Sequence, residues 1–468
     1  MKGRLSIQIT IPHKMKQSII IAMILLGFDA YSQTNPAIVN FLINTTDLTG
    51  RHYLEGNSTP IVDEFPANVQ SVQYSSDYSY MSCSGIPSYI IGPYPDGNPA
   101  LASDNEHLFK LPLIPAENTG NLTSTPLGPI GVFINGVPMY DYKDGNSYNN
   151  QGVWNRDAIL AEKDGFDCAK GHPSPVFDGP PGPGSTLIGG TYHHHQNPSA
   201  FNLDLVVISD ICDLYLADGL YVIDAEVHSP LLGYAFDGYP VYGAYGYTNP
   251  DEAGEISRIR SSYKLRDITA RTTYADGSDV TDGPAVSTTY PLGFYREDYE
   301  FDALSGDLDE HNGRFCVTPE YPDGIYCYFA TVDENWNSAY PYLVGPTYYG
   351  VVETDNFSGP GQGGVTITEP VVTYNPANSV FESMLDESNI TVFPNPTSDL
   401  IAIQLSEASH QNIQVELFDV TGKLVNRSQI NQGSTIAYFD TKTLYAGEYL
   451  LVFNHEGQKL TRRIIVTK

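Results

Sequence analysis

Three consecutive histidines are the residues of this sequence best suited to chemistry. They form the run Tyr192-His193-His194-His195. In an extended strand alternate side chains share a face, so His193 and His195 point one way while Tyr192 and His194 point the other. Two imidazoles at i and i+2 can converge on one cation, and neutral imidazole is the commonest protein ligand for ions such as Zn, Cu and Fe. We interpret His193 and His195 as a metal-binding pair.

Such a site needs further ligands from distant parts of the chain. His172 and His228 are candidates because each lies in a proline-containing turn. Asp237 precedes a glycine, and its carboxylate can accept a hydrogen bond from the imidazole N–H that does not face the metal. The full set of residues predicted to orient the ligands or to replace one is Tyr192, Asp237, Asp309, Glu310 and His311. Together with segments 228–243 and 306–314, the histidine strand is predicted to build one polar site. The alternative is a hydrogen-bond network of structural histidines.

Other chemistries have weaker support in the sequence. No Gly-x-Ser-x-Gly, His-Glu-x-x-His or P-loop pattern occurs, and no catalytic residue is assigned. The loop from Asp276 to Asp282 has acidic spacing only partly like that of a Ca2+ loop. Tyr242, Tyr245 and Tyr247 form an aromatic strip, which more often packs in a β-core than stacks on a sugar. Two alternatives to simple metal binding stay open: a non-catalytic glycan-binding or adhesion module, and a metal-dependent hydrolase or oxidoreductase.

Composition predicts the elements that position these residues. The chain has 34 Tyr, 42 Gly and 33 Pro, with only 17% charged residues. Aromatic residues favour strands while Gly and Pro form turns, so we expect an all-β protein of many short strands. Strands are predicted within 131–140 and 221–228, and the one helix near 155–163. The net charge of −31 opposes binding to nucleic acid.

The chain divides into four segments. Residues 1–32 read as a signal peptide, with Met15 as an alternative start, because basic residues precede an apolar run that is too short to span a bilayer, which takes roughly 20 residues. No later stretch is apolar enough to cross a membrane. A large irregular β-rich domain is predicted over 33–354, a flexible linker over 355–388, and a small antiparallel β-sandwich over 389–468.

Five cysteines are present, at positions 83, 168, 212, 316 and 327. Export permits disulfides, but an odd number leaves at least one thiol unpaired. Cys316 and Cys327 flank the turn-rich stretch Thr318–Gly324, and a hairpin there would bring them face to face. We predict a disulfide between these two.

The C-terminal segment resembles the type A sorting domain of the type IX (Por) secretion system of Bacteroidetes. The phrases that carry the resemblance are Val392-Phe-Pro-Asn-Pro-Thr397, Leu417-Phe-Asp-Val-Thr-Gly-Lys423, Leu444-Tyr-Ala-Gly-Glu-Tyr449 and Thr461-Arg-Arg-Ile-Ile-Val-Thr-Lys468. The resemblance implies that the type IX machinery is a partner. It also implies a final location in the medium or on the outer cell surface.

Residues 33–353 resemble a YHYH-domain protein. The tetrapeptide that names the family falls on Tyr192–His195, with His194 in place of its second tyrosine, and leaves His193 and His195 intact. Further matching blocks are 134–140, 167–173, 228–243, 290–299, 306–314 and 317–324. The family implies no activity, so the expectation remains a secreted or cell-surface protein that binds Zn, Cu or Fe, with an extracellular glycan or small molecule as a further ligand.

Overall fold

The fold is described from a computed structural model. It describes residues 35–97, 100–179, 182, 184–199, 212, 214–215, 219–357, 364–376, 390–405, 409, 413–431, 434–455 and 458–468. The predicted signal peptide, with its alternative start at Met15, lies outside the described residues. Among those described, no helix has the length and apolar character that a membrane crossing requires.

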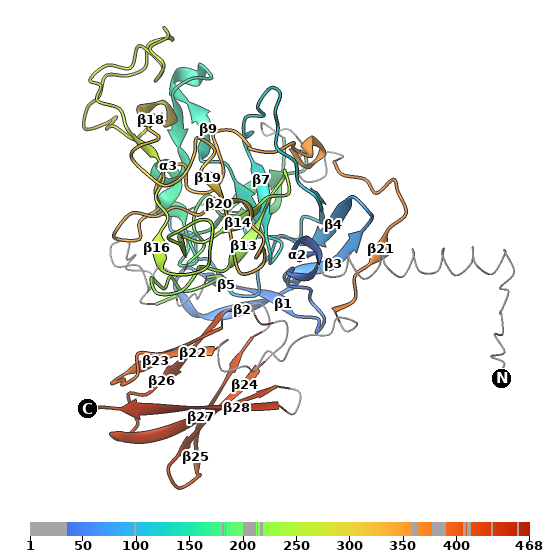
Figure 1. Cartoon of the computed structure of the whole chain (residues 1–468), viewed down its shortest axis with the longest axis vertical. Helices are drawn as coiled ribbons and strands as arrows, with labels where there is room; N and C mark the ends of the chain where they lie inside the picture. The colour runs from blue at the N-terminus through green and yellow to red at the C-terminus, as the bar shows by residue number, and fades with distance from the viewer. Residues whose placement is uncertain are drawn as a thin grey trace, which may run out of the picture.

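A six-stranded sheet lies at the centre of the larger, N-terminal unit (Figure 1). Its order is β19 (Gly313–Cys316), β20 (Ile325–Phe329), β14 (Pro240–Tyr242), β13 (Leu231–Ala235), β7 (Pro129–Phe133) and β8 (Pro138–Tyr140). All neighbours pair antiparallel except β14 and β20. Every residue of β13 is buried, which is expected of a central strand covered on both faces.

Smaller sheets surround this centre. One has the order β21 (Val372–Thr373), β3 (Val69–Tyr74), β4 (Tyr78–Cys83) and β6 (His107–Pro112), and another has β2 (Asn57–Pro66), β1 (Thr49–Leu54) and β5 (Ile90–Ile91). Four two-stranded ribbons complete the unit: β9 (Lys143–Ser147) with β10 (Asn155–Asp157), β11 (His172–Phe177) with β12 (Leu187–His193), β15 (Tyr245–Tyr247) with β16 (Ile256–Arg258), and β17 (Tyr263–Leu265) with β18 (Tyr299–Phe301).

Helical segments are short. The α-helices of the described residues are α2 (Pro36–Val39) and α3 (Ala158–Glu162), and the 3-10 turns are η1 (Tyr148–Asn150), η2 (Lys163–Gly165), η5 (Arg296–Asp298) and η6 (Thr354–Phe357). The helix α3 lies inside the region where the sequence predicted one. The all-β fold class is confirmed.

The two strand predictions in the large domain had different outcomes. The segment 131–140 forms the β7–β8 hairpin, whose turn places Gly136 at φ +82°. The segment 221–228 is not a strand, so that prediction was wrong. The Glu226 N–H donates to the Asp224 side chain 2.9 Å away, and this local turn interrupts the extended backbone.

The C-terminal unit is a sandwich of two antiparallel sheets, drawn in orange and red in Figure 1. The sheets are β22 (Ile390–Phe393), β23 (Leu400–Leu405) and β26 (Ile436–Asp440), and β25 (Leu424–Ile430), β24 (Ile413–Asp419), β27 (Gly447–His455) and β28 (Gln458–Val466). The small antiparallel β-sandwich predicted for this segment is confirmed, and its β24–β25 turn places Gly422 at φ +84°.

Part of the predicted linker packs against the large domain. β21 pairs with β3, and Tyr374 beside it is buried. The two units also touch directly, because Val222 of the large domain packs with Ala402 and Ile436, while Gln404 Nε2 donates to the Val222 carbonyl at 3.2 Å.

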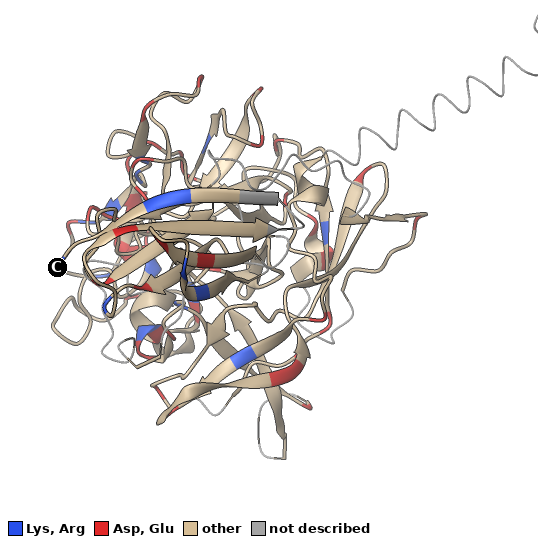
Figure 2. Ribbon diagram, turned by 90° about the horizontal axis from the view of Figure 1, so that it is seen from below, with Lys and Arg blue, Asp and Glu red and all other residues tan. Residues whose placement is uncertain are grey.

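Figure 2 marks the acidic residues in red on the ribbon, where they occur in many loops and strands, with the fewer basic residues in blue scattered among them. The excess of acid is therefore distributed over the protein. Such a surface keeps a protein soluble through mutual repulsion.

The disulfide in the structure joins Cys168 and Cys212, which the sequence did not predict. The predicted pair, Cys316 and Cys327, is not bonded, and its sulfur atoms lie 3.5 Å apart. The hairpin register explains the difference. Cys316 is opposite Ile325, and Cys327 is opposite Arg314, so the two cysteines are diagonal neighbours.

The pairing predicts a thiol count. Protein unfolded without reductant should show three reactive thiols, those of Cys83, Cys316 and Cys327. A colorimetric thiol assay measures this number, and mass spectrometry of an unreduced digest should find one cross-linked peptide containing Cys168 and Cys212. A count of one thiol would show that Cys316 and Cys327 are joined as well.

Burial of His107 makes stability depend on pH. The ring lies on β6, stacks on Phe109 with 5.0 Å between centroids, and leaves its buried Nε2 atom without a hydrogen-bond partner among the described residues. Burial lowers the pKa of His107 to about 4. Below pH 6.5 the unfolded chain therefore takes up a proton at His107 that the folded chain excludes.

The substitution His107→Gln isolates this effect, because glutamine stays neutral at every pH. Above about pH 6.5 the difference in unfolding free energy between wild type and variant should be constant. As the pH falls from about 6.5 to about 4, the wild type should lose stability relative to the variant by about 3 kcal/mol, at about 1.4 kcal/mol per pH unit. Urea unfolding across this range measures the difference. A difference independent of pH would contradict the assignment.

Candidate metal centre

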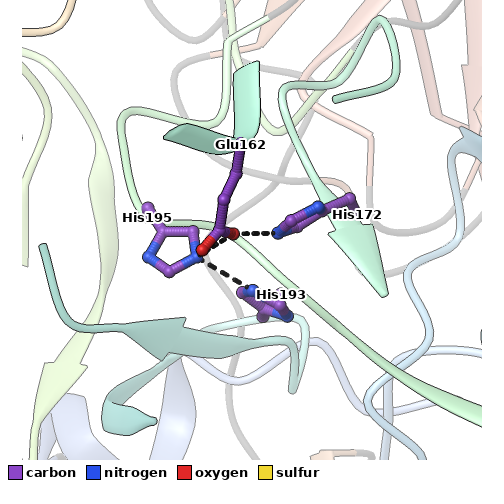
Figure 3. Close-up of side chains that lie close together, drawn as sticks. All are labelled: Glu162, His172, His193 and His195. Carbon is purple, nitrogen blue, oxygen red and sulfur yellow. Dashed lines mark hydrogen bonds and ion pairs between the residues drawn. The ribbon is translucent and has the colours of Figure 1, made fainter. Parts of the chain in front are cut away.

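Four side chains from three separate parts of the chain meet in the large domain. They are Glu162, His172, His193 and His195, and one ligand atom from each lies within 4.8 Å of the others. Within the part of the chain that the structure describes, this is the one group of three or more His, Cys, Asp or Glu with that geometry. Figure 3 shows the Glu162 carboxylate reaching between the rings.

The register of one β-ribbon places two of the histidines. In the antiparallel pair β11–β12, His172 lies directly opposite His193. Directly opposed residues project to the same face of the ribbon, so their rings come together, with centroids 4.7 Å apart. Beyond β12, His194 bridges to Met139, and the bend at His195 brings its ring to within 4.8 Å of the His193 ring, measured between centroids. The structure thus brings together His172, His193 and His195.

The short helix α3 brings the carboxylate. The side chain of Asp157 caps α3 by accepting the Leu160 N–H at 3.1 Å, and the same carboxylate accepts the Tyr342 hydroxyl at 2.7 Å. This anchoring fixes the start of α3. Glu162, at the last position of the helix, is thereby aimed at the histidines.

Carbonyl groups behind two of the rings determine which ring nitrogens face the centre. His193 Nδ1 lies 2.9 Å from the Thr191 carbonyl, and His195 Nδ1 lies 2.5 Å from the Asp141 carbonyl. A carbonyl can only accept, so each Nδ1 carries the proton. In the neutral rings the two Nε2 atoms are therefore unprotonated, and they face each other at 3.0 Å.

The carboxylate completes an electron-rich centre. Glu162 Oε2 lies 2.8 Å from His172 Nε2 and 3.2 Å from His195 Nε2. Burial alone would lower the pKa of His195. The negative charge of the neighbouring Glu162 carboxylate and the hydrogen bond to it together have the larger effect, so the pKa of His195 is raised. Burial, together with neighbouring His172 and His195, lowers the pKa of His193 well below its usual value. Burial would raise the pKa of Glu162, but His195 and His172 hold it far below its normal value.

Aromatic rings wall the centre. Tyr140 stacks on His193 with centroids 3.7 Å apart, and Phe166 meets His172 edge-on at 4.9 Å. His172 Nδ1 is buried and has no hydrogen-bond partner among the described residues. The walls hold the three rings in place, since rotating any of them would displace a packed neighbour.

A pocket of about 420 Å³ opens onto the centre. The three histidines and Glu162 line it together with Tyr140, Lys143, Asp144 and Ser174. The Glu162 side chain is 21% exposed, compared with 9% or less for His172 and His195. Small solutes can therefore approach from the carboxylate side.

The opposite face of the histidine strand has a structural role. Tyr192 donates its hydroxyl to the buried Asp167 carboxylate at 2.9 Å. The Gly92, Ala169 and Gly171 N–H groups donate to the same carboxylate. Asp167 therefore joins the histidine strand to the backbone of the loop that leads into β11.

The ring of His194 ties the strand to the same loop. One of its nitrogens lies 2.7 Å from the Tyr89 hydroxyl, and the other lies 3.0 Å from the Lys170 carbonyl. Lys170 precedes His172 by two residues. The anchoring face of the strand thus fixes the segment that carries one of the candidate ligands.

The structure places His228 away from this centre. Its Nδ1 lies 2.7 Å from the Ser229 carbonyl, and its ring packs on Tyr242 and Tyr247. The cause is connectivity: His228 leads into β13 of the central sheet, whereas His172 and His193 lie on the β11–β12 ribbon. We therefore replace His228 by Glu162 in the candidate ligand set.

The other predicted supporting residues also lie elsewhere, except Tyr192. Asp237 accepts the Tyr328 hydroxyl at 2.6 Å, and Asp309 accepts the Tyr326 hydroxyl at 2.9 Å. Glu310 is exposed, and His311 Nδ1 lies 2.8 Å from the Thr347 hydroxyl. The predicted single site built from segments 228–243 and 306–314 is thus two separate regions.

Sequence reasoning missed Glu162. The residue lies inside the helix predicted near 155–163, and a single acid at the end of a helix carries no metal signal of its own. The available signal was the helix cap, because an Asp at the N-cap position, here Asp157, predicts where α3 begins. Glu162 then lies about one and a half turns further on. Nothing in the sequence says that this turn meets the histidine strand, since that contact depends on where α3 lies relative to the β11–β12 ribbon.

Comparison with known proteins identifies both units. The model of the secretion system C-terminal sorting domain matches residues 391–467. The protein is accordingly a type IX cargo that is exported to the cell surface or the medium, and the sorting unit implies interaction with the secretion machinery.

Individual similar proteins cover little of the chain. An endo-acting ulvan lyase of Formosa agariphila is 34% identical over 89 residues, which are 19% of this chain and 17% of the lyase. The chain thus matches less than a fifth of that relative's length. A solved DUF3244 family protein with an immunoglobulin-like β-sandwich fold, from Bacteroides vulgatus, is 20% identical and covers 17% of this chain and 85% of its own, with a TM-score of 0.15. That score supports no structural argument.

The large domain has the more informative match. The model described as YHYH protein matches residues 108–341, which is half of the 468-residue chain. The matched range contains Glu162 and all three histidines of the candidate centre. The chain belongs to the YHYH protein family.

Proposed function

We propose that this exported protein binds one transition-metal ion through His172, His193, His195 and Glu162. The observation that carries the proposal is the approach of His193 Nε2 to His195 Nε2 at 3.0 Å. Both rings donate from Nδ1 to carbonyl groups, so two lone pairs face each other in a buried site. Such an arrangement is repulsive unless a positive charge lies between them.

The donor set suits such an ion. Three imidazole nitrogens and one carboxylate oxygen are ligands that Zn, Cu and Fe accept. A tetrahedral ion with bonds of about 2.0–2.1 Å separates its ligand atoms by about 3.4 Å. The contacts of 2.8, 3.0 and 3.2 Å between ligand atoms would open slightly around such an ion, while the remaining separations, which lie within 4.8 Å, would adjust toward the same value. With neutral histidines the group carries one negative charge, which a divalent cation more than neutralises.

The surroundings also fit. The carbonyl groups of Thr191 and Asp141 accept hydrogen bonds from Nδ1 of His193 and His195. Metal-bound histidines commonly make such a hydrogen bond from the nitrogen that does not bind the metal. The pocket beside Glu162 supports access of a small ligand to the ion. When bound, the ion would act as a Lewis acid toward that ligand or toward water.

Elemental analysis tests the proposal. The full, tag-free chain, purified after incubation with Zn, Cu and Fe salts and desalted, should contain about one metal ion per chain. His193→Ala and His195→Ala should reduce this content at least about tenfold, because each removes one ligand and leaves the site incomplete. Inductively coupled plasma mass spectrometry gives the stoichiometry.

Matched controls separate the centre from histidines in general. His228→Ala and His311→Ala should keep the metal, since both rings lie outside the centre. Glu162→Gln is the milder variant, because the side chain is partly exposed, and it should weaken binding while circular dichroism stays that of the wild type. Wild-type protein without metal in all three salts would refute the proposal.

Metal should also stabilise the fold. An ion that binds only the folded state at about 100 times its dissociation constant adds about 2.7 kcal/mol, which corresponds to a melting temperature higher by on the order of 5 °C. Differential scanning calorimetry with and without a chelator measures the shift. In His193→Ala the chelator should have no effect, and a shift of equal size there would place the stabilising ion elsewhere.

A further inference from the structure

A second pocket lies on the region that the predicted residues Asp237 and Asp309 build. It has a volume of about 580 Å³, within the range of small-molecule sites. Its lining includes Glu117, Tyr239, Phe315, Tyr321, Tyr326 and Tyr349. The described residues that line it are all different from those of the candidate metal centre.

We propose that this second pocket binds a neutral pyranose sugar. A pyranose has one apolar face of C–H groups, which packs on aromatic rings, and hydroxyl groups at its edge, which both donate and accept hydrogen bonds. The pocket offers both kinds of partner. The proposal does not depend on the metal centre.

An exposed ring provides the platform. Phe315 on β19 is 63% exposed, which is unusual for a residue of its size. One side of the ring rests on Gly324, where an added Cβ would lie 2.7 Å from Phe315 Cε1. Gly324 also has φ +84°, a conformation that favours glycine, and the absence of a side chain there leaves room for the Phe315 ring. The remaining side of the ring is open for stacking.

Two carboxylates, one buried and one half-buried, hold the other rings in position. Asp237 is fully buried and accepts the Tyr328 hydroxyl and the Gly350 N–H, while the Tyr328 hydroxyl accepts the Tyr349 N–H at 2.8 Å. Asp309 accepts the Tyr326 hydroxyl. These bonds fix the rings that form the back of the pocket.

The rings also pack on one another. Tyr326 and Tyr349 stack with centroids 3.7 Å apart, and Tyr239 packs edge-on against both. The wall is therefore rigid before any ligand arrives. Such rigidity reduces the entropy lost on binding.

Polar groups at the wall match sugar hydroxyls. The Tyr239 hydroxyl has no hydrogen-bond partner among the described residues, and the carboxylate of Glu117 is exposed at the same wall. Among the described residues that line the pocket there is no Lys, Arg or His. With a net charge of −31 and an acid at the wall, sulfated and uronic sugars are repelled, and the neutral class remains.

A glycan array tests this directly. The full chain should bind neutral gluco-, manno- or xylo-oligosaccharides and not their sulfated or uronate counterparts. Titration calorimetry with the best neutral ligand should show about tenfold weaker binding for Phe315→Ala, and a smaller loss for Tyr239→Phe, which removes only the hydroxyl. Phe301→Ala, at another exposed phenylalanine on β18, is the matched control and should bind as the wild type does.

Four results would overturn the proposal. They are absence of neutral-sugar binding up to about 10 mM, binding that Phe315→Ala leaves unchanged, self-association of the chain that Phe315→Ala abolishes, and sugar binding that a chelator removes. The third would make the pocket an interface between copies, and the fourth would assign the sugar to the metal centre. Binding that persists in a chelator supports a sugar site independent of that centre.

Discussion

The close approach of the Nε2 atoms of His193 and His195, 3.0 Å apart, is the interaction on which the candidate centre depends, because two neutral rings would place two lone pairs face to face there. The surrounding structure prevents the usual solutions, because carbonyl groups fix both Nδ1 protons and packed aromatic rings prevent rotation. The remaining way to compensate the lone pairs is a positive charge at the centre. The proposed metal ion would supply this charge, and a proton shared with Glu162 would be the metal-free substitute, which agrees with the raised pKa of His195.

Side chains alternate between the two faces of a β-strand, so the four consecutive residues Tyr192–His195 have two separate roles. Tyr192 and His194 bind the loop that carries His172, and His193 and His195 face that same histidine across the ribbon. The hydrogen bonds of Tyr192 and His194 on one face therefore help to position the candidate ligands on the other. Replacing the family's second tyrosine by His194 leaves this division intact, because His194 still hydrogen-bonds on the anchoring side.

Carboxylates, three of them buried and that of Asp309 half-buried, are used repeatedly in this fold to hold aromatic side chains. The pairs, each a carboxylate that accepts a tyrosine hydroxyl, are Asp157 with Tyr342, Asp167 with Tyr192, Asp237 with Tyr328 and Asp309 with Tyr326. A chain with many tyrosines and short strands cannot rely on long sheet ladders, so these bonds fix the loops between them. The same device positions Glu162 in one pocket and the tyrosine wall in the other.

The sequence by itself determined the fold class, the terminal sandwich, and the shared face of His193 and His195, because strand periodicity and turn chemistry are local. It also indicated His172 as a candidate ligand, although the structure places this residue on strand β11 and not in the expected turn. Only the tertiary structure decided that Glu162 completes the group, that His228 lies in another region, and that Cys168 bonds to Cys212. Each of these depends on which distant segments pack together, and such contacts leave no periodic signal along the chain.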